Sequence, residues 1–296
     1  MVRVDLHTHS TASDGLLSPR RLVEAARGQR VTTLALTDHD TTGGLAEALE
    51  AGGACGIDVI PGVEINTDVG EHEVHILGYW VDYARASLQV FLRCMRDGRL
   101  RRAEEMVQKL RAFGAPIEWS RVCEIAAGAS IGRPHVARAL VEAGRVGSTR
   151  EAFERLIGRH GPAYVPRPKL APEEAVGVIA EHDGVPVLAH PGWAASGPVI
   201  QQLPQLIANG LAGIEVYYPD HSPEMVAEYR DLAEQHGLVV TGGTDYHGGG
   251  LATRVPLGSV PMPPDVVPTL RARWEALRSS RASRPAADSR EMRRDT

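Results

Sequence analysis

The segment VDLHTHSTASDG, residues 4–15, begins as an apolar run and ends in polar side chains that can bind a metal. His7 and His9 are two residues apart, and Asp14 follows among small residues. Side chains at i and i+2 of a strand project from the same face, so the two imidazoles can bind one ion together. The segment therefore predicts a strand whose end carries a metal site, with Asp14 in a loop that folds back over it.

Similar side chains occur in TDHD, PGVE, HEVHILGYW, LAHPG and GTDYHG, at or near the ends of other apolar runs. The carboxyl ends of strands are where barrel enzymes place their chemistry. None of these side chains is a thiolate, which favours Mn, Fe or Zn over softer ions, and the donors are too many for one ion. The candidate metal ligands are His7, His9, Asp14, His39, Glu64, His75, His190, Asp245 and His247.

Apolar runs rich in β-branched residues predict seven strands, at 2–6, 33–37, 58–63, 74–79, 185–189, 213–217 and 238–241. Helical patterns separate several of them. Ser18 with a following proline predicts one helix start, Thr41 or Thr42 a second, and Pro172 a third. Strands that alternate with helices favour parallel pairing and a closed or nearly closed β/α barrel.

Residues 85–169 break this alternation with a run of helical patterns. We expect a small helical domain there, inserted into a discontinuous barrel formed by residues 1–84 and 170–277. Residues 278–296 contain almost no large apolar side chains and are predicted to be a disordered tail.

Charge follows the same division of the chain. The two barrel segments carry net charges of −8 and −9, the insert +9 and the tail +3, which together make the total of −5. An acidic body can hold cations while a basic insert attracts an anion. The alternative, that Arg-rich helices simply have solvated faces, stays open at this point.

Composition excludes several classes of protein. With 296 residues, of which 43% are apolar, the chain can bury a core that needs neither disulfides nor a structural metal. The 3 cysteines are scattered without metal-site spacing, which is typical of a reducing compartment. We expect no signal peptide, no membrane span, a cytoplasmic location and no obligate protein partner.

Taken together, DLHTHS with Asp14, TDHD, PGVEI, His75, AHPG and GTDYHG resemble the motifs of the polymerase and histidinol phosphatase (PHP) superfamily of metal-dependent phosphoesterases. The insert, with IGRPHVARAL and YVPRPKLAPEEAV, is similar to the nucleoside 3',5'-bisphosphate phosphatase and 5'-3' exoribonuclease branch. The resemblance implies a distorted (β/α)7 barrel with an inserted helical domain.

The resemblance also implies a trinuclear centre of divalent ions, with Mn favoured and Fe or Zn as alternatives. Glu64 would bridge two of the ions. The three implied ligand sets are His7, His9, Glu64 and Asp245 for one ion, Glu64, His75 and His190 for a second, and Asp14, His39 and His247 for the third. Glu64, His190, Asp245 and His247 are the residues expected to carry catalysis.

Such a centre points to phosphate-ester hydrolysis. Clustered cations lower the pKa of a water and neutralise a phosphoryl group, so hydroxide can attack phosphorus without a protein nucleophile. The predicted reaction is removal of the 3'-phosphate of nucleoside 3',5'-bisphosphates. The alternatives are a 5'-3' exoribonuclease acting on short RNA, a phosphatase of another small metabolite such as histidinol phosphate, and a non-enzymatic, polymerase-associated metal scaffold.

Basic residues of the insert are candidates for binding a phosphate that is not cleaved. Arg133 and His135 lie in IGRPH, and Arg167 and Lys169 lie where the chain returns to the barrel. A guanidinium offers bidentate geometry to phosphate. Arg133 and His135 could instead merely begin a helix. His221, after another strand, is a further candidate substrate-binding residue.

Overall fold

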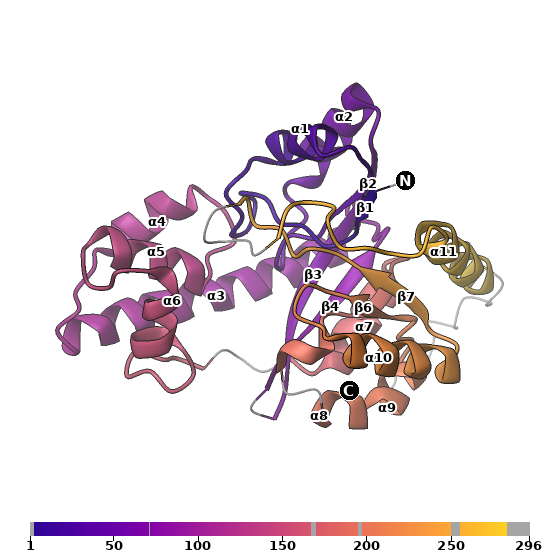
Figure 1. Cartoon of the computed structure of the whole chain (residues 1–296). Coiled ribbons are helices and arrows are strands. Elements are labelled where there is room, and N and C mark those ends of the chain that lie inside the picture. Colours follow the sequence, from indigo (N-terminus) through magenta and orange to yellow (C-terminus); the bar gives the residue numbers. More distant parts are fainter. Residues whose placement is uncertain (1–2, 71, 167–169, 195–196, 250–254, 283–296) are drawn as a thin grey trace, which may run out of the picture.

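A single seven-stranded sheet, with its strands in chain order, forms the body of the protein (Figure 1). The structure is a computed structural model that describes residues 3–70, 72–166, 170–194, 197–249 and 255–282. The seven predicted strands are all present. Their bounds are β1 Arg3–Asp5, β2 Val31–Leu36, β3 Asp58–Val69, β4 His72–Tyr79, β5 Val185–Leu188, β6 Gly213–Tyr217 and β7 Val239–Gly242.

Strand β4 runs opposite to the rest of the sheet. The β1–β2, β2–β3, β5–β6 and β6–β7 pairs are parallel, whereas β4 is antiparallel to both β3 and β5. The prediction of parallel pairing is therefore wrong at β4. Only two residues separate β3 from β4, and Gly70, with φ 59°, allows the tight reversal that makes them a hairpin.

The sheet curls until its first and last strands meet. In the described residues no ladder joins β1 to β7, but the Leu6 N–H donates to the Gly242 carbonyl at 3.2 Å. Just beyond the strands, Thr8 forms a parallel bridge with Tyr246. The barrel is thus nearly closed, and residues that are more than two hundred positions apart lie side by side.

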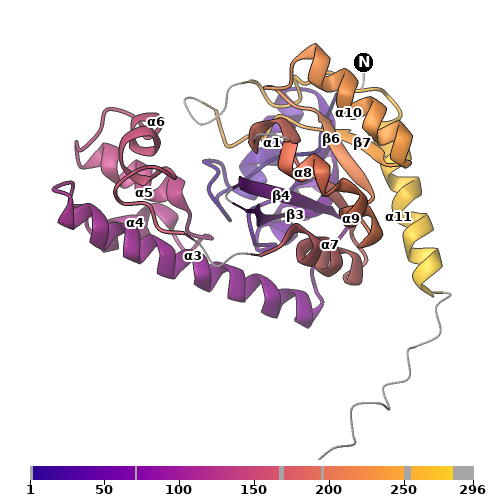
Figure 2. The ribbon, with the colours of Figure 1, turned by 90° about the horizontal axis from the view of Figure 1, so that it is seen from below.

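Helices surround the barrel (Figures 1 and 2). The Ser18 side chain caps the first of them by accepting from the Arg21 N–H, as predicted. The predicted cap at Thr41 or Thr42 is wrong, because Gly44 occupies that position and offers no side chain. These helices are α1 Pro19–Gly28, α2 Leu45–Cys55, α7 Pro172–Glu181, η2 Pro191–Ala194, α8 Gly197–Gln201, α9 Leu203–Ala208, α10 Pro223–His236 and α11 Val266–Ala282.

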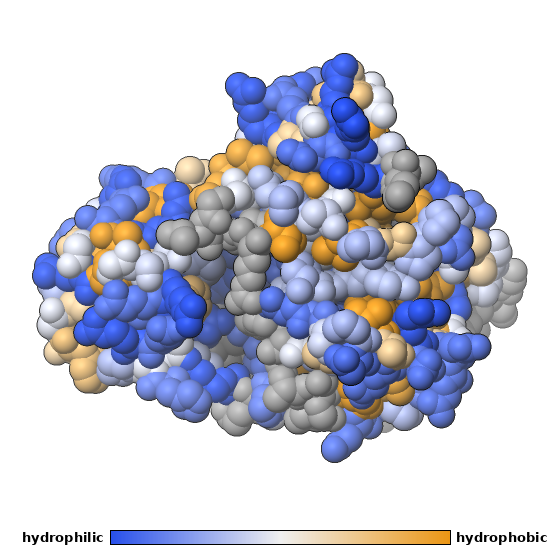
Figure 3. Space-filling model, in the orientation of Figure 1, coloured by the Kyte–Doolittle hydropathy of each residue, from blue (hydrophilic) through white to orange (hydrophobic). Residues whose placement is uncertain are grey.

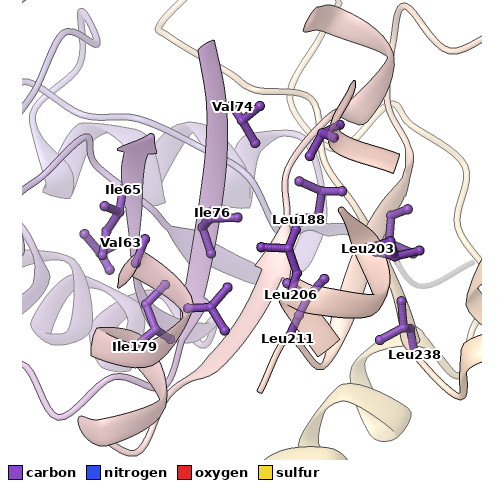
Figure 4. Close-up of a cluster of buried hydrophobic side chains, with 14 of the residues drawn as sticks. Val63, Ile65, Val74, Ile76, Ile179, Leu188, Leu203, Leu206, Leu211 and Leu238 are labelled. Atoms are coloured by element: carbon purple, nitrogen blue, oxygen red, sulfur yellow. The ribbon is translucent and has the colours of Figure 1, made fainter. Parts of the chain in front are cut away.

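The principal core lies between the middle strands and helices α7 and α9 (Figure 4). Ile76 of β4 and Leu188 of β5 are fully buried there, against Ile179 of α7 and Leu206 of α9. Alternate strand residues face this layer, and the helices present one apolar side to it. The core therefore fixes the strands that end at the polar end of the barrel.

The inserted segment is helical, as the sequence predicts. It comprises α3 Ala86–Ala112, α4 Trp119–Ala126, α5 Arg133–Glu142, α6 Thr149–Ala152 and the π-helix η1 Phe153–Ile157. Its helices share a hydrophobic cluster of their own, which includes Leu110 and Leu140. The first turns of α3 contribute Leu88 and Leu92 to the barrel core instead. One long helix thus ties the insert to the barrel (Figure 2).

The end of the chain differs from the prediction of a tail at 278–296. Helix α11 continues to Ala282, so residues 278–282 are helical, and residues 283–296 lie outside the described residues. The Trp274 indole N–H donates to the Asp183 carbonyl at 2.9 Å, which anchors this helix to the barrel. None of the described helices is long and apolar enough to cross a membrane.

The core makes a prediction about stability. Replacing Ile76 by Ala should lower the free energy of unfolding by about 2–5 kcal/mol, because it removes buried methyl groups and leaves a cavity. Leu100, which is 40% exposed, is the matched control. Its change to Ala should stay within about 0.5 kcal/mol of the wild type in urea unfolding. Equal effects of the two variants would contradict this assignment of the core.

Candidate metal centre

All nine predicted ligands lie together at one end of the barrel. Four groups of them bring potential ligand atoms within 4.8 Å of one another. The groups are His9 with Asp14, His39 and His247; His7 with Glu64 and His190; His7 with His9 and Asp245; and His39 with Glu64 and His75. These residues come from six different strands or the loops after them, with Glu64 and His75 inside β3 and β4, so only the folded barrel creates the cluster.

Glu64, on β3, lies at the middle of the cluster and is 1% exposed. Its carboxylate oxygens lie within 3.3 Å of five imidazole nitrogens. Oε1 is 2.8 Å from His75 Nδ1 and 3.1 Å from His190 Nε2, and Oε2 is 3.0 Å from His39 Nδ1 and 3.3 Å from both His7 Nε2 and His9 Nε2. One carboxylate thus faces two separate sets of ligands.

Two further carboxylates extend the cluster. Asp245 Oδ1 lies 3.1 Å from His9 Nε2 and 3.4 Å from His7 Nε2. Asp14 lies 3.3 Å from His247 Nε2 and 3.9 Å from His39 Nε2. The loop that carries Asp14 therefore folds back over the histidines, as the sequence predicts.

The backbone is strained where it presents these groups. Asp40, His190 and Asp245 adopt positive φ angles of 52°, 22° and 53°. Such angles are uncommon for residues other than glycine and persist only when the surrounding structure enforces them. Strain at two predicted ligands and next to a third is typical of a functional site.

Outer carboxylates, which the sequence did not single out, hold the ligands in place. Glu215, fully buried in β6, has both oxygens 3.1–3.2 Å from His7 Nδ1 and also accepts from the His190 N–H at 2.8 Å. Asp38 accepts from Ser10 and Ser13, which fixes the loop before Asp14. Such outer partners orient metal-binding histidines. An acidic residue inside the apolar run GIEVY was the available signal for Glu215.

Within the part of the chain that the structure describes, several buried atoms of the cluster have no hydrogen-bond partner. His7 Nε2, His9 Nε2, His39 Nδ1 and Glu64 Oε2 all lack one although they face one another. An unpaired buried polar atom costs free energy. A divalent cation accepts lone pairs from nitrogen and carboxylate oxygen alike, so this donor set fits metal ions of the Mn, Fe or Zn type.

The carboxylates of the cluster raise the pKa values of some of its histidines in spite of burial. Burial lowers the pKa of His9, but Asp245 and Glu64 raise it more, to about 10. Burial also lowers the pKa of His75, but the nearby Glu64 carboxylate raises it more, to about 9. Burial would raise the pKa of Glu64, yet the surrounding histidines hold it well below its usual value. The carboxylate is therefore charged and ready to bind cations at neutral pH.

A cavity of about 240 Å³ lies between the cluster and the insert. Its floor includes Glu64, His75 and Asp245, and its other wall comes from α3, the segment that leads into α5, the start of α5 and the start of η1. That wall combines apolar side chains with arginines. The apolar residues are Met95, Met106, Ile131 and Phe153, and the arginines are Arg99, Arg102 and Arg133. Figure 3 shows the surface hollowed between the lobe formed by α4–α6 and the barrel.

The predicted phosphate-binding residues occupy different positions. Arg133 lines the cavity, lies 2.5 Å from Glu73 and stacks over the Phe153 ring at 5.5 Å. The buried His135 accepts from the Gly132 N–H at 3.0 Å and so caps the start of α5. Arg167 and Lys169 lie outside the described residues.

His221 does not line the cavity described above. Its Nδ1 lies 2.8 Å from the Val216 carbonyl, and its Nε2 accepts from the Gly192 N–H at 3.3 Å. Both ring nitrogens are thus engaged with the backbone. The side chain supports the loop that follows His190.

Comparison with known proteins identifies relatives along the whole chain. The family described as "PHP domain" matches residues 5–118. A 3',5'-nucleoside bisphosphate phosphatase of Chromobacterium violaceum is 37% identical, over 97% of this chain and 100% of that protein. A 5'-3' exoribonuclease, Rnm, of Salmonella typhimurium is 37% identical, over 82% of this chain and 84% of that protein. The solved structure of a protein assigned as a metal-dependent phosphoesterase, from Bifidobacterium adolescentis, is 34% identical and has a TM-score of 0.83, covering 91% of this chain and 95% of that one.

Glu64→Gln keeps the shape of the central side chain and removes its charge. We expect metal affinity to fall by more than about 100-fold, because even the loss of an outer partner costs about 10–100-fold. Circular dichroism should be unchanged, since the hydrophobic core lies elsewhere. Titration against a metal-binding dye measures the affinity, and wild-type binding by this variant would rule out Glu64 as the central ligand.

Metal binding should release protons. At pH 7 the metal-free His9 is protonated, because its pKa is raised to about 10, and a cation must displace this proton. Apparent affinity should therefore rise from pH 7 toward pH 9. Calorimetry in buffers with different heats of ionisation counts the released protons; a count of zero at pH 7 would contradict this protonation scheme.

Proposed function

Because this chain belongs to the PHP family of metal-dependent phosphoesterases, we propose that it removes the 3'-phosphate of nucleoside 3',5'-bisphosphates. The similarity to a phosphatase and an exoribonuclease identifies the chain as a phosphate-ester hydrolase. The observation that carries the narrower proposal is the cavity, which has a cluster of metal-binding side chains on one wall and the Arg133 guanidinium on the other. A substrate with two separated phosphates matches both walls.

The proposed centre holds three divalent ions, with Mn favoured. His7, His9, Glu64 and Asp245 would hold one ion, Glu64, His75 and His190 a second, and Asp14, His39 and His247 the third. Oε2 of Glu64 lies near His7 and His9, and Oε1 lies near His75 and His190, which supports its role as a bridge between the first two ions. When bound, such ions neutralise the phosphoryl charge and provide a water of low pKa.

The protein's own residues prepare the site for this chemistry. Glu215 beside His7 Nδ1 fixes the tautomer that leaves Nε2 with its lone pair toward the centre. The His247 Nδ1–H donates to the Asp245 carbonyl at 2.8 Å, which likewise turns Nε2 toward Asp14. Asp245 receives a further hydrogen bond from the Tyr218 hydroxyl. The site is preorganised, so little rearrangement accompanies binding.

Arg133 is the proposed ligand of the phosphate that stays on the product. In the free protein it pairs with Glu73, and Phe153 supports its guanidinium plane. A phosphate monoester carries about −1.5 to −2 charges, so it competes well against a single carboxylate. Arg167 and Lys169 stay proposed as further phosphate ligands, and His135 would act indirectly by holding the start of α5.

A 5'-3' exoribonuclease acting on short RNA is the second candidate, and the identity to Rnm supports it. The cavity, at about 240 Å³, is smaller than the roughly 300–1,000 Å³ of common ligand pockets, which favours one nucleotide unit over a longer strand. Histidinol phosphate fits less well, because its amine would face arginines. A metal scaffold without activity is disfavoured by the complete set of ligands. The cytoplasmic location stays a prediction.

Arg133→Ala tests the assigned phosphate site. A charge-assisted hydrogen bond is worth about 1.5–3 kcal/mol, so kcat/KM for a nucleoside 3',5'-bisphosphate should fall about 10- to 150-fold. An aryl phosphate, which has no second phosphate, should be hydrolysed almost as before. Arg138, on the same helix but not in the wall of this cavity, supplies the control, and Arg138→Ala should leave both rates near wild type. Equal losses on the two substrates would assign Arg133 to the metal site or the fold instead.

A further inference from the structure

We propose that Arg99, which the insert contributes, is a positioning residue of the metal centre in the barrel. Helix α3 carries Arg99 across the cavity, where its side chain is only 15% exposed. The guanidinium binds two barrel residues at once, Asp40 through Nε at 2.5 Å and the Asn66 side-chain oxygen through Nη2. This inference rests on the metal centre proposed above but not on the identity of the substrate.

The first of these partners, Asp40, holds two proposed ligands. It directly follows His39, and its N–H donates to the Glu64 carbonyl at 2.9 Å. Its carboxylate accepts from the Asn66 N–H at 3.2 Å, and its φ of 52° needs such restraint. A second arginine of α3, Arg96, donates to the Asp40 carbonyl at 3.1 Å. The insert thus holds the strained turn that sets the position of His39.

The second partner of Arg99, Asn66, contacts another proposed metal ligand, His75. Its side-chain amide lies 2.7 Å from His75 Nε2, and His75 Nδ1 lies 2.8 Å from Glu64. Asn66 and His75 are also paired across the β3–β4 hairpin. Arg99 therefore connects with Glu64 by two routes, one along the backbone at Asp40 and one through the His75 ring.

The geometry of arginine explains why this residue type stands here. Its planar fork can bind two acceptors in fixed directions, whereas the ammonium of lysine is a point charge on a flexible stem. The buried Asp40 carboxylate, 1% exposed, needs a partner that also supplies hydrogen bonds. Outer partners of metal ligands typically contribute about 10- to 100-fold in metal affinity. The insert would then complete the metal site as well as cover the substrate.

Arg102 provides a matched comparison. It lies nearly one turn further along α3 and lines the same cavity. Its Nε donates to the Val165 carbonyl at 2.8 Å, and its guanidinium lies over the Tyr164 ring at 5.5 Å. Both of these partners belong to the insert. A loss of charge from the cavity wall affects Arg99 and Arg102 alike, but Arg99 binds Asp40 and Asn66 beside the proposed metal ligands, whereas Arg102 binds the Val165 carbonyl in the insert.

The test compares Arg99→Gln, Arg99→Lys and Arg102→Gln in the full chain by competition for Mn(II) or Zn(II) against a chromophoric chelator. We expect about 10- to 100-fold weaker metal binding for Arg99→Gln. Arg99→Lys should also bind weakly, since it keeps the charge but not the fork, and Arg102→Gln should bind within about twofold of wild type. Wild-type affinity in both Arg99 variants, or an equal loss in Arg102→Gln, would overturn the proposal.

Further measurements separate positioning from a loss of fold. Circular dichroism and thermal unfolding show whether Arg99→Gln is folded, and if it is not, Arg99→Lys becomes the deciding variant. Arg99→Gln should also have a smaller effect in an Asn66→Ala background, because one route is already broken. Fully additive losses would contradict that route. If the wild-type protein bound no metal, the metal centre itself would be refuted. If wild type and variants bound metal with equal affinity, only the role of Arg99 would be refuted.

Discussion

A buried, charged carboxylate organises this protein. Glu64 is 1% exposed and faces five imidazoles, and a charge so deeply buried is tolerated only when it is paired and hydrogen-bonded. Its partners come from β1, β2, β4 and β5 or the loops after them, so the barrel must close far enough to bring them together. The Thr8–Tyr246 bridge does so at the seam, where it places Asp245 beside His7 and His9.

The need to surround the buried Glu64 charge also accounts for the roles of the barrel and the insert. The acidic barrel supplies the donors for cations, while the basic insert faces them across the cavity with arginines. Helix α3 belongs to both parts, because Leu88 and Leu92 pack in the barrel core and Leu110 packs in the core of the insert. Such a connection can hold a guanidinium at a fixed distance from the proposed metal ligands. Helix α3 thus joins the acidic barrel to the basic insert as one continuous element.

The strands and the individual candidate ligands could be predicted from local sequence patterns. Seven apolar runs indicated the strands, and short motifs in or after these runs indicated the individual ligands, because both signals depend on residues close together in the sequence. The convergence of these ligands into one cluster depends on the folded barrel. The direction of β4 was missed although its connection to β3 is only two residues long. Because β4 runs in the opposite direction, His75 reaches the cluster from the first half of its strand rather than from the end. Glu215 and Arg99 were missed because their partners, His7 and Asp40, are 208 and 59 positions away. No spacing rule links residues that only tertiary structure brings together.

Phosphate release is the most direct test of the proposed metal-dependent 3'-phosphatase activity. The purified protein, reconstituted with Mn, would be given nucleoside 3'-phosphates, 5'-phosphates and 3',5'-bisphosphates, with and without a chelator. We expect the fastest release from the bisphosphate, slower release from the 3'-monophosphate, little from the 5'-monophosphate, and loss of all activity on chelation. Equal release in the presence of the chelator, or no release from any phosphate ester with metal restored, would contradict this expectation.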